Sequence, residues 1–546
     1  MNIIKASEHN IKPNCDVTVE LNALLESLRG DNQAKTLQFE NAVYYIDSNL
    51  CVKRELHITN TAGEKEYKSG ETPCINEVPF YLNDIHNLVI DGCGATFVID
   101  GKVTNIAVER CENITFRNLS IKYSHPDMHE FKVSKVTPFS VEWDIDDNSN
   151  IQEIGGDFAF VGRNYVHPFK KYQYFSWAWI GCIRQDNPDN IRRVFHPLFK
   201  SIKTTRIGER KFKTTYFGTR RFKVGDKLYL YDVRRQYAGI FATDTKNLVL
   251  DNIRQHFNYS LAIVVQNCEN IDVVNSTFAP ADDSKVMMAS VADFIQMCSC
   301  RGLLNITGNL FDGAGDDCLN VHGIHFKIVS KDDNKIVVRF MHPQTYGFNP
   351  LNVGDDIAFI NIDSMLETGR TKILSSTLVG KYDIELELQD ASGAIVGEAV
   401  EDISSCPDVI FKDNTLNRII TRGLLLTTRG KVLVENNHFK NNSMSGILLS
   451  DDARGWYESG MCCDVTIKGN TFDYCGGTPI LILPENKVHK GAVHKNIVIE
   501  NNHFNDYHKE CIYAKSTDNI RIQNNTYKPN NKKLVLKNCT NVDMKD

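Results

Sequence analysis

The sequence predicts an all-β protein, a right-handed parallel β-helix with two small β-barrel-like modules inserted into it. Short apolar runs of strand type end in an Asn that is followed closely by an aromatic residue, and they recur about every 20 to 25 residues. Such a period is typical of a solenoid, whose coils stack their strands about 4.8 Å apart. The repeat also stops twice, for two long stretches that resemble each other. The recurring endings are Asn275/Phe278, Asn437/Phe439, Asn470/Phe472, Asn502/Phe504 and Asn525/Tyr527.

The segment before the regular coils has a different pattern. Glu20 to Leu28 has the apolar spacing of a helix, and a short helix there would cover the exposed end of the solenoid. Leu37 to Ile46 alternates and reads as an opening strand. We therefore expect an N-terminal cap and the first coils within residues 1–121.

The two interruptions are predicted to be copies of one small β-module. Phe131-Lys132-Val133 opens the first and Phe326-Lys327-Ile328 the second, and a Gly225-Asp226 turn matches a Gly354-Asp355 turn. Both modules leave the solenoid one coil either side of the stretch from Ala292 to Gly323, so they are expected to wall a site there. The expected division is 122–236 for the first module, 237–323 for the coils between the modules, 324–406 for the second module and 407–546 for the C-terminal coils.

Asparagines stand at one point of each C-terminal coil. Stacked amides bond from coil to coil, so we interpret these residues as a structural ladder. They are Asn414, Asn437, Asn470, Asn502 and Asn525.

Composition excludes several classes of function. The chain has 62 Lys and Arg against 68 Asp and Glu, a net charge of −6. Its one basic stretch, Arg206 to Arg221, alternates with Phe, Tyr and Thr as on a solvated strand, so no nucleic-acid partner is expected. No apolar run is long enough for a membrane span.

Compartment and assembly are less constrained. The first residues, Met1 to Lys5, lack the apolar core of a signal peptide, which indicates a cytoplasmic protein; an exported protein whose signal peptide has been removed would look the same. A homodimer is one possible assembly. The 16 cysteines are scattered without a CxxC pair, so we expect reduced thiols that pack as small apolar groups, and neither a metal site nor a cofactor.

The chemistry is expected at three carboxylates. Asp316 and Asp317 follow Asp293 by 23 and 24 residues, which is one repeat. If Asp293 and Asp317 occupy the same point on successive coils, all three carboxylates converge on one patch. Like charges at a few ångströms raise at least one carboxyl pKa, and glycoside hydrolysis needs a carboxylic acid beside carboxylates. Three aspartates are also a possible calcium site, because hard oxygen ligands suffice.

Strand alternation selects the neighbours of these carboxylates. Leu319 and Val321 are expected to point inward, which sends Cys318 and Asn320 outward. One coil earlier the same reasoning sends Phe294 and Gln296 outward. Gln296 and Asn320 would then stack beside the aspartates, where they either bond a sugar or extend an amide ladder.

Four further residues are candidates for substrate contacts. His322 either holds the protonation state of the acid or is a buried structural residue. Arg429 is a candidate cationic contact. Trp456 and Glu458 lie in a long loop, Asp451 to Gly460, whose composition is typical of a sugar platform. A packed aromatic corner is the alternative for Trp456.

Two families resemble these motifs. Asp316-Asp317-Cys318-Leu319-Asn320-Val321, one coil after Ala292-Asp293-Phe294-Ile295-Gln296, resembles the polygalacturonase arrangement, in which three aspartates on a right-handed parallel β-helix hydrolyse a glycoside with inversion. The chain more closely resembles glycoside hydrolase family 110, exo-acting α-1,3-galactosidases with two β-barrel insertions and an Asp-Asp-Ala-x-Asn-Val-His-Gly segment. Residues 316–323 match that segment, whereas Gln296 stands where the family is expected to have His.

The resemblance implies a function and roles. Asp316 would be the general acid, and Asp293 and Asp317 would position and deprotonate the water, about 6.5 to 9.5 Å from the acid as inversion requires. The substrate would be an oligosaccharide or glycoconjugate with terminal α-galactose, of blood-group-B type or linear.

Alternatives from other classes stay open. A polygalacturonase-like or other polysaccharide-active enzyme would need cationic groups for uronates, for which Arg422 and Arg429 leave room. A non-catalytic glycan-binding solenoid would need no carboxylate cluster.

Overall fold

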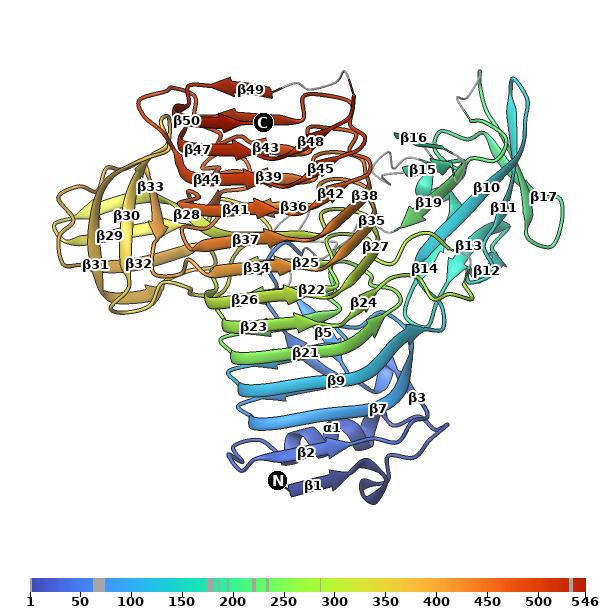
Figure 1. The fold of residues 1–546 in the computed structure, drawn as a ribbon. Coiled ribbons are helices and arrows are strands. Elements are labelled where there is room, and N and C mark those ends of the chain that lie inside the picture. Colours follow the sequence, from blue (N-terminus) through green and yellow to red (C-terminus); the bar gives the residue numbers. More distant parts are fainter. Residues whose placement is uncertain are drawn as a thin grey trace.

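The computed structural model describes residues 2–61, 74–173, 181–184, 187–193, 196–218, 222–231, 235–284, 286–529 and 534–546. Within them the chain forms a parallel β-helix from which two modules project on opposite sides in the view of Figure 1. The predicted fold class is therefore confirmed. Arg220 and Arg221 of the basic stretch lie outside the described residues.

The β-helix has three walls of parallel strands. The first wall holds the longest strands, and in several coils its strands continue around a corner into the second wall. Its strands are β2 (Lys35–Gln38), β7 (His86–Asp100), β9 (Glu112–Tyr123), β21 (Lys246–Gln255), β23 (Glu269–Val274), β26 (Arg301–Thr307), β34 (Asp408–Lys412), β37 (Lys431–Glu435), β41 (Asp464–Lys468), β44 (His494–Glu500), β47 (Thr517–Gln523) and β50 (Thr540–Lys545). The second wall adds β3 (Val43–Asp47), β24 (Thr277–Phe278), β27 (Leu310–Ala314), β35 (Thr415–Ile419), β38 (His438–Asn442), β42 (Thr471–Phe472), β45 (His503–Phe504) and β48 (Thr526–Tyr527).

The third wall carries the polar residues of interest. Its strands pair in parallel and in register, so that Ile263, Ile295 and Leu319 lie side by side. The strands are β6 (Phe80–Asn83), β8 (Ile106–Glu109), β20 (Ile240–Thr243), β22 (Ile263–Gln266), β25 (Ile295–Cys298), β28 (Leu319–Asp332), β36 (Leu424–Leu426), β39 (Ile447–Leu449), β43 (Ile480–Ile482), β46 (Ile512–Lys515) and β49 (Leu534–Lys537).

One continuous apolar core fills the space between the walls. Inward residues of successive coils stack on each other, as Phe472 and Phe504 do with ring centroids 5.0 Å apart. Cysteines such as Cys268, Cys300 and Cys475 are buried in this core, as predicted for thiols acting as small apolar groups.

The N-terminal segment differs in part from the prediction. A helix, α1 (Thr18–Ser27), is present, and its leucines pack into the main core. The single strand predicted from Leu37 to Ile46 is wrong, because the chain turns after Gln38 and forms β2 and β3 on two walls. β1 (Asn2–Lys5) pairs in parallel with β2, and a 3-10 turn, Ala6–His9, follows it.

The asparagine ladder is confirmed. Each side-chain amide donates to the carbonyl oxygen of the next, over 2.9 to 3.1 Å, and every member is buried. The ladder begins one coil earlier than predicted. It runs through Asn309, Asn414, Asn437, Asn470, Asn502 and Asn525.

The second module is a closed antiparallel barrel of six strands around its own apolar core. Its first strand is the far half of β28, so one strand runs from the third wall into the barrel. The others are β29 (Lys335–Arg339), β30 (Asp356–Asn361), β31 (Leu366–Leu378), β32 (Asp383–Leu388) and β33 (Ala399–Asp402). Between this barrel and the wall, β40 (Glu458–Ser459) pairs with β28.

The first module is a five-stranded antiparallel sheet with smaller sheets beside it. The large sheet consists of β17 (Lys203–Arg206), β18 (Lys211–Thr215), β11 (Ser140–Ile145), β10 (Met128–Val136) and β19 (Lys227–Tyr231). The smaller elements are β12 (Ile151–Ile154), β13 (Asp157–Val161), β14 (Val166–Pro168), α3 (Phe169–Tyr172), β15 (Gly181–Arg184) and β16 (Asn187–Arg193). A hairpin of β4 (Val52–Glu55) and β5 (Ile75–Val78), after the 3-10 turn Ser48–Leu50, lies nearer the N-terminus.

The matching first strands of the two modules occupy equivalent positions, but the matching turns do not. Val133 exchanges backbone hydrogen bonds with Gly225 and Asp226. In the second module Ile328 makes the same exchange with Gly397 and Glu398, not with Gly354-Asp355. The two Gly-Asp turns are therefore similar in sequence but do not occupy equivalent positions in the two modules.

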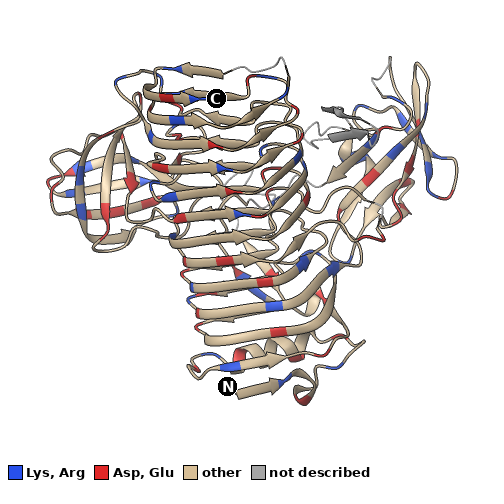
Figure 2. Cartoon of the chain, in the orientation of Figure 1, with Lys and Arg blue, Asp and Glu red and all other residues tan. Residues whose placement is uncertain are grey.

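Charge is spread over the fold, with Lys, Arg, Asp and Glu mixed along the coils and on both modules (Figure 2). Among the described residues, no helix is both long enough and apolar enough to cross a membrane.

Candidate active site

The three predicted aspartates come together at the corner that precedes the third wall. Phe294 donates its backbone N–H to the carbonyl oxygen of Asp317, so Asp293 and Asp317 occupy the same point on successive coils, as predicted. Asp293 and Asp317 are buried, whereas the Asp316 side chain is 25% exposed. The corner therefore presents one carboxylate to solvent and holds two behind it.

Glycines allow the coils to approach at this corner. A Cβ on Gly315 would lie 2.2 Å from the carbonyl oxygen of Val291, and one on Gly313 would lie 2.3 Å from that of Met287. Any larger residue would push the two coils apart. The Gly-x-Gly before Asp316 therefore brings the paired aspartates down onto the coil of Asp293.

Two arginines neutralise part of this cluster. Arg235 contacts Asp316 through Nη2 and Oδ2, 2.8 Å apart. Arg422 binds Asp317 in a fork, with Nη2 2.7 Å from Oδ2 and Nε 2.9 Å from Oδ1, and its backbone N–H also donates to Oδ1. Thr421 donates its hydroxyl toward both Asp316 and Asp317. Charge-assisted forks of this kind fix a carboxylate in position.

Asp293 differs from its partners, because the described residues give its carboxyl group no hydrogen-bond donor. Burial, and then the charges of Asp316 and Asp317, raise its pKa well above the ordinary value. Burial also raises the pKa of Asp317, while Arg422 opposes that shift. Three carboxylates and two guanidinium groups balance in charge when the cluster holds one proton, and these shifts favour Asp293 as its resting place.

The cluster does not resemble a cation site. Two guanidinium groups lie among the carboxylate oxygens that a calcium ion would need, and they already supply the opposite charge. Among the described residues no group of His, Cys, Asp and Glu is arranged to hold a metal ion.

Four of the predicted contact residues form a buried polar network beside the aspartates. Gln296 and Asn320 lie side by side on β25 and β28. They do not extend an amide ladder; Gln296 contacts His322 Nε2 at 3.0 Å, and Asn320 donates to Glu458 Oε1 at 2.9 Å. Burial disfavours a charged imidazole, but Cys298 and Glu458 raise the pKa of His322 to about 10.

The other predicted contacts lie differently. The guanidinium group of Arg429 binds Glu401 and Glu367 at the base of the barrel, so it anchors the barrel to the wall instead of joining the carboxylates. Trp456 is 49% exposed and stacks on His342 of the barrel, with ring centroids 4.3 Å apart. Its loop is held by Asp452, which accepts a backbone N–H from Trp456.

Two orientation predictions were wrong. Phe294 and Cys318 are buried in the main core, not turned outward. Both precede the first paired residue of their strands, where the chain is still in the corner and the two-residue alternation of a strand does not yet apply.

Sequence comparisons identify relatives over nearly the whole chain. An α-1,3-galactosidase A of Bacteroides thetaiotaomicron is 32% identical over 540 residues, covering 94% of this chain and 90% of the relative. The chain belongs to the α-1,3-galactosidase A and B family, glycoside hydrolase family 110. An α-1,3-galactosidase B of Phocaeicola vulgatus is 28% identical, covering 91% of this chain and 84% of the relative.

Two further comparisons concern the barrel and the fold of the whole chain. Residues 335–398 match the family model described as GLAA-B beta-barrel domain II, and they lie within the six-stranded barrel. Among solved structures, an exopolygalacturonase from Thermotoga maritima is similar with a TM-score of 0.37 and 11% identity, covering 100% of this chain and 92% of that one.

Sequence reasoning did not find the residues that balance the charge in this galactosidase-family chain: it named Arg422 only as a possible contact for uronates, and it did not name Arg235. Arg422 had a signal. It precedes Leu424 by two residues, as Asp293 precedes Ile295 and Asp317 precedes Leu319, so the register of the coils predicts that all three share one corner. Arg235 had no such signal, because it lies in the connection from the first module to β20, outside the repeat.

Proposed function

We propose that this chain is an inverting exo-α-galactosidase that releases terminal α-1,3-linked galactose from an oligosaccharide or glycoconjugate. The observation that carries the proposal is the cluster of Asp293, Asp316 and Asp317, charge-balanced by two arginines, in a chain of the α-1,3-galactosidase family. Substrates of blood-group-B type and linear α-galactosides fit the proposal equally.

In this proposal Asp316 is the general acid. It is the most exposed of the three carboxylates, so its oxygen can meet the leaving oxygen of a bound glycoside. The single proton of the cluster rests on Asp293, so in this proposal it passes to Asp316 before cleavage, and Arg235 fixes the orientation of Asp316. Protonation of the leaving oxygen accompanies breakage of the bond to the anomeric carbon.

Asp317 and Asp293 act on the water in the same proposal. Asp317 is held by Arg422 and Thr421, which suits a carboxylate that must accept a proton at a fixed position. Water attacks the anomeric carbon from the face opposite the leaving group, and its proton passes to this pair. One proton leaves the cluster and one enters it, so the charge is restored after each turnover.

The test is a comparison of linkages and anomers. The protein is incubated with α-1,3-, α-1,4- and α-1,6-linked galactobiose, and galactose release is followed by proton NMR from the first minutes. We expect release from the α-1,3 linkage, with β-galactose appearing first and the α-anomer only as mutarotation proceeds. An α-anomer appearing first would overturn inversion, and the absence of galactose from all three substrates would overturn the activity.

A further inference from the structure

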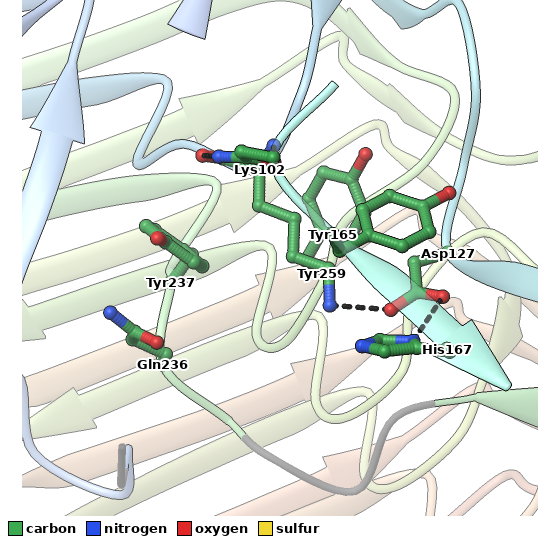
Figure 3. A pocket seen from close by; sticks show the side chains of 8 residues that line it. Lys102, Asp127, Tyr165, His167, Gln236, Tyr237 and Tyr259 are labelled. Carbon is green, nitrogen blue, oxygen red and sulfur yellow. Dashed lines mark hydrogen bonds and ion pairs between the residues drawn. The ribbon is translucent and has the colours of Figure 1, made fainter. Parts of the chain in front are cut away.

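A polar pocket separate from the three carboxylates lies where the first module meets the β-helix. It has a volume of about 110 Å³. A cavity needs only about 10–15 Å³ to hold one water molecule, so this pocket has room for a larger ligand. Figure 3 shows Gln236 and Tyr237 on one side and Lys102, Tyr165, Asp127 and His167 on the other. The lining residues are Lys102, Asp127, Asn164, Tyr165, His167, Gln236, Tyr237 and Tyr259.

The register of the coils places this pocket on the same corner as the aspartates. Ile106, Ile240 and Ile263 continue the row of paired residues that leads to Ile295 and Leu319. The pocket residues Lys102, Gln236 and Tyr259 each precede a member of that row by four positions, and Asp293 and Asp317 precede theirs by two. At about 4.8 Å per coil, Tyr259 lies about 10 Å from the coil of Asp316.

A short segment of chain connects the pocket with the carboxylates. Arg235 binds Asp316, and the next two residues, Gln236 and Tyr237, line the pocket. The Gln236 amide donates to the carbonyl oxygen of Ile75, and the Tyr237 hydroxyl donates to Glu77, so the hairpin of β4 and β5 supports this segment. A ligand in the pocket would therefore sit directly beside the residue that orients Asp316.

The tyrosines of the pocket are fixed in position. Tyr165 and Tyr259 both donate their hydroxyls to the carbonyl oxygen of His125, over 3.2 and 3.1 Å. The Lys102 ammonium lies 4.8 Å from the ring centroid of Tyr165 and 5.7 Å from that of Tyr259. Fixed aromatic rings beside hydrogen-bonding groups fit a sugar, because the rings cover its apolar face and the polar groups bind its hydroxyls.

The charges of the pocket favour a neutral ligand. The Lys102 ammonium forms an ion pair with Asp127, which is itself buried between His129 and His167. A uronate, sulfate or sialic acid would have to compete with Asp127 for the same ammonium. A neutral ring needs no ion pair, and the hydroxyl oxygens of Tyr165 and Tyr259, which donate to His125, can accept hydrogen bonds from its hydroxyls.

We propose that this pocket is a subsite for a neutral sugar ring on the aglycone side of the scissile bond. The proposal rests on the proposed function, since it takes Asp316 as the group that meets the leaving oxygen. The galactose to be removed would lie at the carboxylates, and the remaining glycan would run along the corner toward the N-terminal coils and the first module.

The test compares two substrates in the full chain. One is an aryl α-galactoside, which has no sugar beyond the scissile bond, and the other is a neutral trisaccharide with a terminal α-1,3-galactose. The variants are Gln236→Ala and Tyr237→Ala. The control is Gln523→Ala, a glutamine that also makes a side-chain hydrogen bond, to Glu500, on a distant coil. Thermal unfolding midpoints establish that all variants are folded.

We expect the ratio of kcat/KM for the trisaccharide to kcat/KM for the aryl galactoside to fall about tenfold in both variants, mainly through KM, and to stay constant in the control. A displaced Arg235 would lower both constants together and leave the ratio unchanged, and that result would overturn the subsite. Unchanged constants would also overturn it. If the wild type releases galactose from neither substrate, the proposed function itself fails.

Discussion

Two stacks of polar side chains on the same β-helix have opposite electrostatics. From Asn309 through the C-terminal coils to Asn525, buried asparagines bond to one another, because each amide has both a donor and an acceptor. At the corner of the third wall, Asp293 and Asp317 are stacked at the same coil spacing. Two carboxylates are both acceptors, so they can form a hydrogen bond with each other only if one of them is protonated. The same coil-to-coil stacking therefore stabilises amides through hydrogen bonds and raises the pKa of carboxyl groups through charge repulsion.

The difference shows that the repeat by itself builds the stabilising ladder, whereas the candidate active site also needs a residue from outside the repeat. The amide ladder needs only its own repetition, so it extends over consecutive coils without help from other elements. The carboxylates need Arg235, which comes from outside the repeat, and Arg422 from the next coil. The site is thus confined to the coils that Arg235 reaches from the end of the first module.

The largest effects are expected from neutralising the carboxylates one at a time. Asp293→Asn and Asp317→Asn should each lower kcat by about 10² to 10⁴ on natural and aryl α-galactosides alike, because water must be deprotonated whatever the leaving group. Asp316→Asn should lose as much on α-1,3-galactobiose but retain part of its activity on an aryl galactoside with an activated phenol, which needs less acid assistance. The measurement is kcat/KM on both substrates.

This series also tests the assignment of roles. If the activated phenol spares Asp317→Asn and not Asp316→Asn, the acid and base are exchanged. If all three variants keep near-normal turnover while they remain folded, the chemistry lies elsewhere on the chain.

A large loss of stability is expected from interrupting the amide ladder. Asn470→Ala leaves the backbone and side-chain donors of Asn437 without their buried acceptor, while Asn502 Oδ1 keeps the backbone N–H of residue 470 as a donor. Each unsatisfied group costs about 1–3 kcal/mol. We expect a loss of about 3 kcal/mol, measured as a lower midpoint of denaturant unfolding. Asn505→Ala is the matched control, because Asn505 donates to Asp473 on the exposed surface and, like Asn470, does not have a left-handed backbone conformation. Equal losses in the two variants would mean that burial does not decide the value of a ladder bond.

The sequence predicts the features that repeat from coil to coil, and it does not predict those that depend on single contacts. The coils, the ladder and the register of Asp293 with Asp317 all repeat, so periodicity finds them. The turn at Gln38, the buried positions of Phe294 and Cys318 and the partners of Arg429 depend on where the chain leaves a strand or meets a module. Such contacts are set by tertiary packing, and no local pattern records them.

A smaller effect of opposite sign is expected for the stability of Asp293→Asn. The folded state holds a proton on Asp293 that the unfolded chain releases near pH 4, so wild-type stability falls as the pH rises through that value and continues to fall toward the raised pKa. Asn carries no such penalty. We expect the variant to be more stable by about 1–2 kcal/mol at pH 8 and to lose this advantage near pH 4. Denaturant unfolding at both pH values measures it, and an advantage that does not depend on pH would contradict the electrostatic explanation.

The smallest effect on stability is expected at Gln296, a stacked amide like those of the asparagine ladder that lies beside the carboxylate cluster. Gln296 and Asn320 are stacked amides, yet they bond sideways to His322 and Glu458, and Gln296 Oε1 has no partner among the described residues. Gln296→Met keeps the shape and removes one hydrogen bond, so we expect it to lower stability by less than about 1 kcal/mol, much less than Asn470→Ala. Because the network adjoins the carboxylates, kcat/KM on α-1,3-galactobiose should fall about fivefold. A stability loss as large as that of Asn470→Ala, with unchanged activity, would instead make Gln296 a structural residue of the wall.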